Sequence, residues 1–237
     1  MHQNFCIIIP SRIGSTRLKN KPLIDLHGQS LIQRVYENAL LITSKSYIAT
    51  DSVQIKDSLK DITKNVVMTS KDHISGTDRI CEAAKKLKIN DDTLILNLQG
   101  DEPFIPKDLL LKVIDDFFLF SCDVITVSNQ LTSDDDLNNP NCVLVEVDSK
   151  NYATKFSRLE KLNNPKRHVG IYGYSFKILK ELVKLEPTKN EVKYKLEQLR
   201  FIENGFSIYV SNYDNEIPNG IDTPEDVKNA NIYLSDK

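Results

Sequence analysis

The sequence predicts an α/β fold: a mainly parallel, twisted sheet with helices on both faces and a small β-rich insertion. Three observations predict it. Short apolar, β-branched runs alternate with amphipathic stretches through the first half of the 237 residues, which is typical of such sheets. Several of the helical stretches begin at capping residues. Strand-like alternation gathers at about 142–176, where the insertion is expected.

The first half contains five runs that are typical of short strands. They are expected at Phe5–Ile9, Tyr47–Thr50, Asn65–Met68, Thr93–Leu98 and Asp123–Val127. Helices are expected at Ser30–Ile42 with Ser30 as N-cap, at Ser52–Leu59, at Thr77–Leu87, and from Pro106 or Lys107 to Phe120. Ligands of parallel sheets bind beyond the carboxyl ends of the strands, so functional motifs should follow the strands directly.

The second half has a different pattern. Two alternating runs, Cys142–Val147 and Tyr152–Phe156, predict a hairpin with a turn at 148–151. A strand is expected at Arg167–Phe176, and another follows at Phe206–Val210. Helices are expected at Lys177–Leu185, at Asn190–Asn204 ending before Gly205, and at Thr223–Leu234 with Thr223 as N-cap. No linker divides the chain, so residues 1–237 are expected to form one domain.

Composition and charge narrow the function classes. The net charge of −2 gives no global footprint for nucleic acid or a membrane surface, and no run approaches the roughly 18 apolar residues of a membrane span. The four cysteines are scattered without metal-ligand spacing, which predicts reduced core thiols. A cytoplasmic protein is expected, since the first residues contain no basic segment followed by a long apolar run.

A basic loop follows the first strand, in CIIIPSRIGSTRLKNKPL. Gly14, Ser15 and Thr16 are small, so that backbone N–H groups there can approach an anion. Arg12, Arg17, Lys19 and Lys21 can add charge-assisted bonds to a polyphosphate. The loop matches neither the P-loop nor the dinucleotide-binding glycine pattern. Taken alone, an anion site and an ordinary basic surface loop are equally plausible, and the position after a strand favours the anion site.

A carboxylate loop follows the Thr93–Leu98 strand, in LILNLQGDEPFI. Asp101 at a strand end suits Mg²⁺, which takes one or two protein carboxylates and completes its shell with water and phosphate. A loop rich in Gly, Asp and Pro that has no ligand is the alternative. Together with the basic loop on the same sheet edge, Asp101 favours a metal and nucleotide site.

A third motif is NGIDTPEDVKNA. Thr223, Pro224 and the acidic residues Glu225 and Asp226 are typical of a helix start, so we interpret those acids as capping residues. Asp222 precedes the cap and is available as a second metal ligand. Two weaker signals are KDHISGTDR, which contains His73, and the segments RHVGIYGY and KLEQLR, whose charges alone indicate an amphipathic helix face.

The assembled motifs resemble the 3-deoxy-manno-octulosonate cytidylyltransferase (CMP-Kdo synthetase) family. The resemblance runs in one order through IIIPSRIGSTRLKNKPL, IATD, HISGTDR, LNLQGDEPFIP, NPNCVLVEVD, FSR, RHVGIYGY, LEQLRFIENGFSI and NGIDTPEDV. Sialate cytidylyltransferases are similar at the first loop but typically show a G-G-S-K-R version. The resemblance implies a Rossmann-like nucleotidyltransferase fold.

The resemblance also implies the roles of individual residues. CTP would be bound by Arg12, Gly14, Ser15, Arg17, Lys21, Ser75, Gly76, Thr77 and Arg79. The sugar acid would be bound by Gln99, Arg158, His168, Tyr172, Glu197 and Gln198. Asp101 and Asp222 would hold Mg²⁺ and would be catalytic together with Lys21. The family implies a homodimer, with part of the insertion and the Glu191–Asn204 region near the interface.

Two departures from the family pattern stand out. Lys19-Asn20 replace a Pro-Gly pair, and the segment Leu159–Lys166 is short and polar where the family has a proline-rich segment. We therefore keep two alternatives beside CMP-Kdo synthesis. One is a cytidylyltransferase for another nonulosonate or amino-octulosonate acid. The other is a non-catalytic homologue that binds sugar nucleotides.

Overall fold

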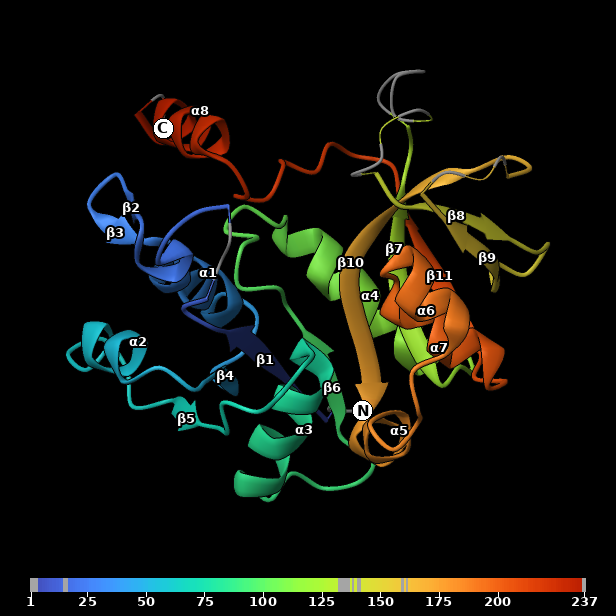
Figure 1. Cartoon of the computed structure of the whole chain (residues 1–237), viewed down its shortest axis with the longest axis horizontal. Helices are drawn as coiled ribbons and strands as arrows, with labels where there is room; N and C mark the ends of the chain where they lie inside the picture. Colours follow the sequence, from blue (N-terminus) through green and yellow to red (C-terminus); the bar gives the residue numbers. More distant parts are fainter. Residues whose placement is uncertain are drawn as a thin grey trace.

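A twisted sheet with helices on both faces forms the centre of the protein, seen in a computed structural model (Figure 1). The structure describes residues 4–14, 17–131, 137, 139, 142–158, 160 and 162–235. Within these residues the strands of the sheet's main path run in the order β11-β7-β10-β6-β1-β4-β5. Their bounds are β1 Phe5–Ser11, β4 Ser46–Thr50, β5 Val66–Met68, β6 Leu94–Asn97, β7 Val124–Asn129, β10 Lys166–Ser175 and β11 Ile208–Tyr213.

The helices other than α6 and α7 lie close to their predicted positions. They are α1 Leu31–Leu40, α2 Val53–Ser58, α3 Gly76–Lys86, α4 Lys107–Leu119, α5 Phe176–Leu182, α6 Lys189–Tyr194, α7 Glu197–Glu203 and α8 Pro224–Ser235, with a 3-10 turn at Lys21–Leu23. Ser30 is the N-cap of α1, as predicted, and its hydroxyl accepts from the backbone N–H of Gln33. Such a cap contributes about 1 kcal/mol of stability. A small hairpin, β2 Asp25–Leu26 with β3 Gln29–Ser30, was not predicted.

The sheet is parallel on both sides of one antiparallel strand. β5, β4, β1 and β6 pair in parallel, as do β7 and β11. β10 lies between β6 and β7 and is antiparallel to both. The predicted mainly parallel sheet is therefore confirmed, but the predicted insertion at 142–176 is too long. Only the hairpin β8 Leu144–Val147 with β9 Ala153–Ser157 lies off the main path.

The predicted single helix Asn190–Asn204 is wrong. Lys195 has a left-handed backbone (φ 54°) and separates α6 from α7. The break turns the chain, so that Glu197 begins a new helix whose N-cap is Leu196. Gly205 (φ 82°) follows α7, as predicted.

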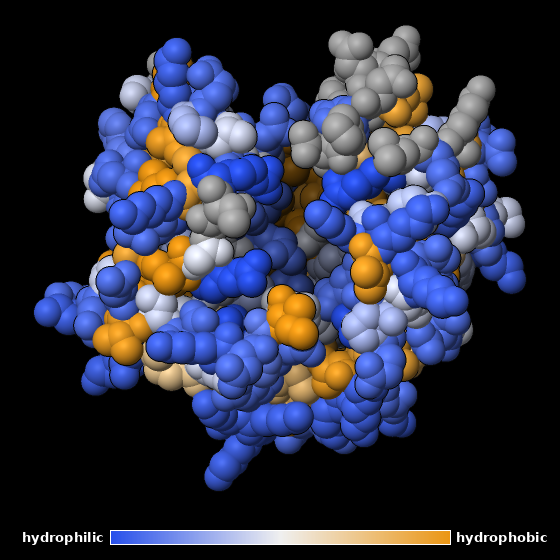
Figure 2. Space-filling view, in the orientation of Figure 1, coloured by the Kyte–Doolittle hydropathy of each residue, from blue (hydrophilic) through white to orange (hydrophobic). Residues whose placement is uncertain are grey.

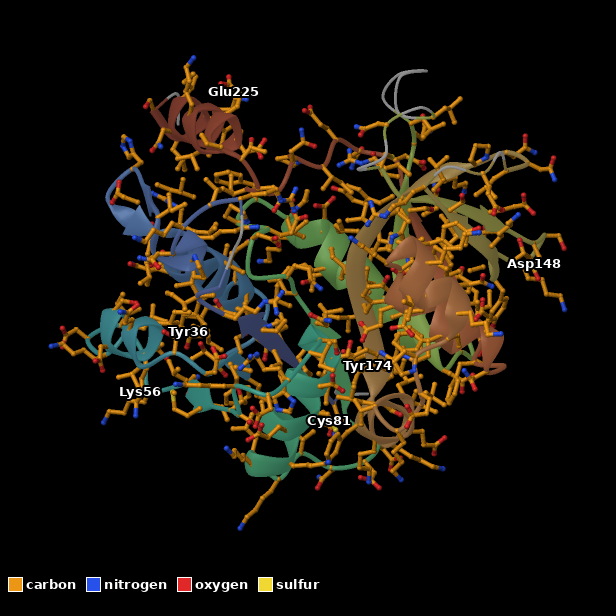
Figure 3. All side chains as sticks on the ribbon, in the orientation of Figure 1. Tyr36, Lys56, Cys81, Asp148, Tyr174 and Glu225 are labelled. Carbon is orange, nitrogen blue, oxygen red and sulfur yellow. The ribbon has the colours of Figure 1, made fainter. Side chains whose placement is uncertain are left out.

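Both faces of the sheet are covered by apolar side chains. Along β1, Ile7 and Ile9 belong to one core cluster and Cys6 and Ile8 to the other, because successive strand residues point to opposite faces. On the second face, Tyr174 of β10 and Cys81 of α3 lie within the same cluster, and Figure 3 marks both. Each fully buried Ile contributes roughly 1.5–3 kcal/mol.

The cysteines behave as predicted. The structure describes all four as free thiols, and burial raises the pKa of Cys6 to about 12. Across the described part of the chain, no helix combines the length and apolar character that crossing a bilayer requires.

Candidate active site

A pocket of about 370 Å³ opens at the carboxyl ends of β1 and β6. Figure 2 shows a hollow on this face, between the half that carries β1 and α1 and the half that carries β10 and α7. Most of the residues predicted to bind the nucleotide or the metal line the pocket. Those residues are Arg12, Gly14, Arg17, Lys21, Ser75, Gly76, Arg79, Asp101 and Asp222, and Gln99 lines it as well. The three sequence motifs thus meet at one site, as expected for strand-end loops.

The basic loop after β1 supplies the cations of the pocket. Arg17 is more than half exposed, and its guanidinium lies 3.0 Å from Asp222. Lys21 begins the 3-10 turn, and its side chain is only 12% exposed. Ser15, predicted to bind the nucleotide, lies outside the described residues.

Lys21 joins the two predicted metal ligands. Its Nζ donates to Asp101 Oδ2 at 2.6 Å and to Asp222 Oδ1 at 2.8 Å. Burial lowers the pKa of Lys21, but Asp101 and Asp222 raise it more, so that the pKa stands above its ordinary value. The ammonium group is therefore held charged at the point where both carboxylates converge.

Backbone contacts hold the two carboxylate loops together. The N–H of Ile221 donates to the carbonyl of Asp101 at 2.8 Å. A Cβ on Gly220 would lie 2.9 Å from Glu102 Oε1, and one on Gly100 would lie 2.9 Å from the carbonyl oxygen of Pro10. Glycine is needed at position 100, where the close atom belongs to the backbone, whereas a Cβ at position 220 would require the Glu102 side chain to shift. Glu102, which the sequence did not single out, is partly buried beside Asp101, and desolvation raises its pKa to about 8.

The donor set fits Mg²⁺. Asp101 and Asp222 offer carboxylate oxygens to one point that already holds a cationic group, and hard oxygen donors are those that Mg²⁺ prefers. The described residues contain no cluster of three or more His, Cys, Asp or Glu side chains that could hold a metal. Two carboxylates suffice for a metal that also takes phosphate oxygens.

The segment before α3 forms another wall of the pocket. Ser75 caps α3, and its hydroxyl accepts from the N–H of Asp78 at 3.1 Å. Arg79 lines the pocket, but its guanidinium donates to Thr69 Oγ1 at 2.5 Å and lies 3.2 Å from Asp51. Arg79 therefore links the first turn of α3 to Thr69 and Asp51. Its predicted contact with the nucleotide stays a prediction.

Thr77 does not line the pocket. Its side chain is buried, and its hydroxyl donates to Glu197 Oε2 at 2.7 Å. The first turn of α3 carries this side chain inward, and the predicted position of Thr77 around the cytidine stays a prediction.

A β-bulge brings two of the predicted sugar-binding residues together. Val169 pairs with Val127 and Tyr172 with Thr126, so β10 carries two extra residues at this point. The bulge shortens the path along the strand, and the rings of His168 and Tyr172 lie 5.6 Å apart.

The hydrogen bonds of His168 define its protonation. Thr126 Oγ1 donates to the carbonyl of Ile171 and lies 2.8 Å from His168 Nε2. A hydroxyl has one proton, so it accepts from an Nε2–H, which leaves Nδ1 as the acceptor of a neutral ring. Burial, helped by the charge of Arg158, lowers the pKa of His168 to about 3. His168 is thus a neutral group.

Two of the remaining predicted sugar-binding residues, Arg158 and Glu197, act on this pair. Arg158 acts electrostatically on both His168 and Tyr172. Burial and the charge of Glu197 raise the pKa of Tyr172 well above its ordinary value. Gln198 is buried, at 4% exposure. Gln99 alone of the six lines the large pocket, where its side chain donates to Asn97 Oδ1 at 3.4 Å.

Sequence reasoning gave no site role to six residues that line the pocket: Pro10, Ser11, Pro22, His73, Ile74 and Gly100. Ser11 precedes Arg12 at the end of β1, and its place at a strand end next to a predicted site residue could have indicated that it lines the pocket. His73 lies in a motif that the sequence did single out, and its Nε2 contacts Glu82 of α3. Ile74 is 88% exposed, which no periodic pattern predicts.

Comparisons with known proteins agree with this architecture. The family model described as cytidylyltransferase matches residues 6–208. The 3-deoxy-manno-octulosonate cytidylyltransferase of Haemophilus influenzae (strain PittEE) is 37% identical, over 98% of this chain and 99% of the relative. The enzyme of that name from Francisella tularensis subsp. tularensis (strain FSC 198) is 40% identical, over 95% and 96%. A solved structure of CMP:2-keto-3-deoxy-manno-octonic acid synthetase complexed with CTP superimposes with a TM-score of 0.91 at 31% identity, covering 99% of each chain.

Proposed function

The chain belongs to the 3-deoxy-manno-octulosonate cytidylyltransferase family, and we propose that it joins CTP to a 3-deoxy-octulosonate sugar acid (Kdo), giving CMP-Kdo and pyrophosphate. One observation carries the proposal. A single pocket combines the cations Arg12, Arg17 and Lys21 with two converging carboxylates, Asp101 and Asp222. A triphosphate with its metal ion needs both kinds of group.

The protein's first task is to hold the triphosphate. Arg12 and Arg17 present planar guanidinium groups that suit phosphate oxygens, and Lys21 adds a compact charge. Arg17 is more than half exposed and Lys21 is fastened between the two aspartates, so the site combines an accessible cation with a fixed one. Such positioning supplies most of the catalysis in phosphoryl-type transfers.

Mg²⁺ is the proposed cofactor, with Asp101 and Asp222 as its protein ligands. When bound, it would neutralise charge that develops on the phosphate oxygens. Lys21 contacts both aspartates, so its ammonium group also offsets negative charge at this point.

The reaction is an in-line displacement at the α-phosphorus of CTP. The anomeric 2-hydroxyl oxygen of the sugar acid forms the new P–O bond as the bond to pyrophosphate breaks, and the hydroxyl proton passes to solvent. Holding the two substrates in line turns a bimolecular step into one within a complex. We propose that Gln99, Arg158, His168, Tyr172, Glu197 and Gln198 bind the sugar acid for this attack.

Recognition of the sugar acid would use a cation, a neutral ring and a carboxylate. Arg158 is the cation proposed for the substrate carboxylate. Neutral His168 offers Nδ1 as an acceptor without adding charge, because its Nε2–H donates to Thr126. Glu197 accepts from distal hydroxyls. A site built to hydrogen-bond a hydroxyl strongly rejects an analogue that lacks it.

We further propose a homodimer. A second hollow, of about 240 Å³, lies between β9 and the helices α6 and α7. The resemblance to the family motivates the proposal, and the contact is expected near this region. Sedimentation equilibrium tests the proposal: a monomer at micromolar concentration would reject it.

Product analysis tests the substrate. CTP and Mg²⁺ are incubated with Kdo, an amino-octulosonate or a nonulosonate, and the products are identified by mass spectrometry. CMP-Kdo as the preferred product supports the proposal. A preference for another acid would mean that this acid, and not Kdo, is the substrate. CTP binding without any product would favour the non-catalytic homologue.

A further inference from the structure

A hydrogen bond links helix α3 to helix α7. Thr77 Oγ1 donates to Glu197 Oε2 at 2.7 Å, although 120 positions separate the two residues. Thr77 is 4% exposed. Just before it in the chain, Ser75 and Gly76 line the nucleotide pocket. One turn of chain therefore contacts the nucleotide pocket and, through Thr77, the helix that carries Glu197.

Arg200 holds the other oxygen of the same carboxylate. Its Nη2 lies 3.0 Å from Glu197 Oε1, and its Nε lies 3.2 Å from Glu191 Oε2. Its Nη1 donates to the carbonyl of Leu185 at 2.9 Å. The guanidinium, whose side chain is 10% exposed, joins α7 to α6 and to the segment after α5.

These contacts fix the orientation of Glu197. Thr77 donates to one oxygen, Arg200 contacts the other, and Ser75 also interacts with the carboxylate, so the plane of the group is defined. The side chain of Glu197 is 29% exposed, so part of it can be reached by a ligand. Its charge reaches Tyr172, which contacts His168. The fixed carboxylate thus lies with Tyr172 and His168 among the proposed sugar-binding residues, which we call the sugar wall.

We infer that Thr77 is a positioning residue: together with Arg200 it orients Glu197 for the hydroxyls of the sugar acid and ties the sugar wall to the nucleotide-binding helix. The inference rests on the proposed function. It gives Thr77 a role in the use of the sugar acid and none in binding CTP directly. Precise orientation by supporting hydrogen bonds is what a specific polar site requires.

Thr77→Val tests the inference, because valine keeps the shape of threonine and removes the hydroxyl. We expect the KM for the sugar acid to rise about 10- to 150-fold, the scale of one hydrogen bond to a charged group. The Kd for CTP, measured by titration calorimetry, should stay within about twofold. Thr77→Ser, which restores the hydroxyl, should restore the KM.

Thr63→Val is the matched control. It removes a hydroxyl that lies 2.7 Å from Tyr36 OH, and it should leave the sugar KM unchanged whatever it does to the melting temperature. A Thr77→Val variant with an unchanged sugar KM, or with CTP and sugar weakened equally, would overturn the inference.

A double mutant tests whether Thr77 acts through Glu197. In a Glu197→Gln background, Thr77→Val should change the sugar KM by less than about twofold, whereas independent effects would multiply. Multiplied effects would overturn the inference. The wild type is measured with Kdo in the same series, and its failure to turn over Kdo would reject the proposed substrate alone. Thr77→Val is then compared on the sugar acid that the wild type accepts, so the two failures remain separate.

Discussion

Lys21 Nζ lies 2.6 Å from Asp101 Oδ2, although 80 positions separate the two residues in the chain. The same ammonium group lies 2.8 Å from Asp222 Oδ1. Three loops from three regions of the sequence thus meet at one charged group. The electrostatic balance of the site depends on this contact, because without it two carboxylates would face each other.

Lys21→Met should therefore reduce kcat/KM for CTP by about 100-fold or more, since it removes a proposed phosphate ligand and leaves the two carboxylates unbalanced. Steady-state kinetics measures the effect. Lys56→Met, on the exposed surface of α2 (Figure 3), is the matched control and should keep wild-type kinetics. Equal turnover in the Lys21 and Lys56 variants would remove Lys21 from the site.

Asp101→Asn and Asp222→Asn should each lower turnover by about a thousandfold or more, because each loses charge from the proposed metal site. A second readout is the Mg²⁺ dependence of CTP binding by calorimetry, which both variants should lose. Asp148→Asn, in the exposed turn between β8 and β9 (Figure 3), should match the wild type. Near-wild-type turnover of either site variant at saturating Mg²⁺ would remove that residue from the proposed metal site.

Arg158→Ala should impair use of the sugar acid far more than binding of CTP. Arg158 acts on His168 and Tyr172, so its loss takes the cation from the wall proposed for the substrate carboxylate. We expect the sugar KM to rise at least about 10-fold. Calorimetry with CTP provides the comparison, and equal damage to both substrates would place Arg158 in the nucleotide site.

The buried neutral His168 predicts a loss of stability in acid. Its pKa is about 3 in the folded protein and about 6.5 when unfolded. Between these values the unfolded chain binds the extra proton, so stability falls as the pH drops below 6.5. The slope reaches up to about 1.4 kcal/mol per pH unit from this group.

His168→Gln measures that contribution, because glutamine keeps a polar side chain and does not titrate. Between pH 7 and pH 5 the free energy of unfolding should fall less in the variant than in the wild type, as measured by urea denaturation. Parallel pH profiles for the two proteins would show that His168 charges equally easily in the folded and unfolded states.

Much of the fold follows from local sequence signals. The capping serine Ser30 and the buried run of β1 are sufficient to place their elements, since both depend on near neighbours in the chain. The break at Lys195 could not be predicted, because a lysine in a left-handed conformation is disfavoured locally and is held there by its surroundings. The antiparallel direction of β10 could not be predicted either, because its pairing with β6 and β7 depends on long-range packing.

In the candidate site, too, features set by local sequence signals could be predicted, whereas contacts between distant segments could not. Asp101 and Asp222 could be proposed as metal ligands because both occur in loops where the local structure does not require a carboxylate. Their contact through Lys21 depends on three distant segments. The contact of Thr77 with Glu197 could not be predicted, because the position of Thr77 in the SGTDR motif carries no information about α7. Ile74 was missed because exposure of an apolar side chain is a property of the folded loop.

Pyrophosphate release under omission conditions tests the central claim most directly. The wild type is assayed with CTP, Kdo and Mg²⁺ together and with each one left out in turn. The account predicts release only when all three are present. It also predicts that the complete mixture gives background release with Asp101→Asn and Asp222→Asn. Release without Kdo, release that persists with a chelator, or no release from the complete mixture would contradict it.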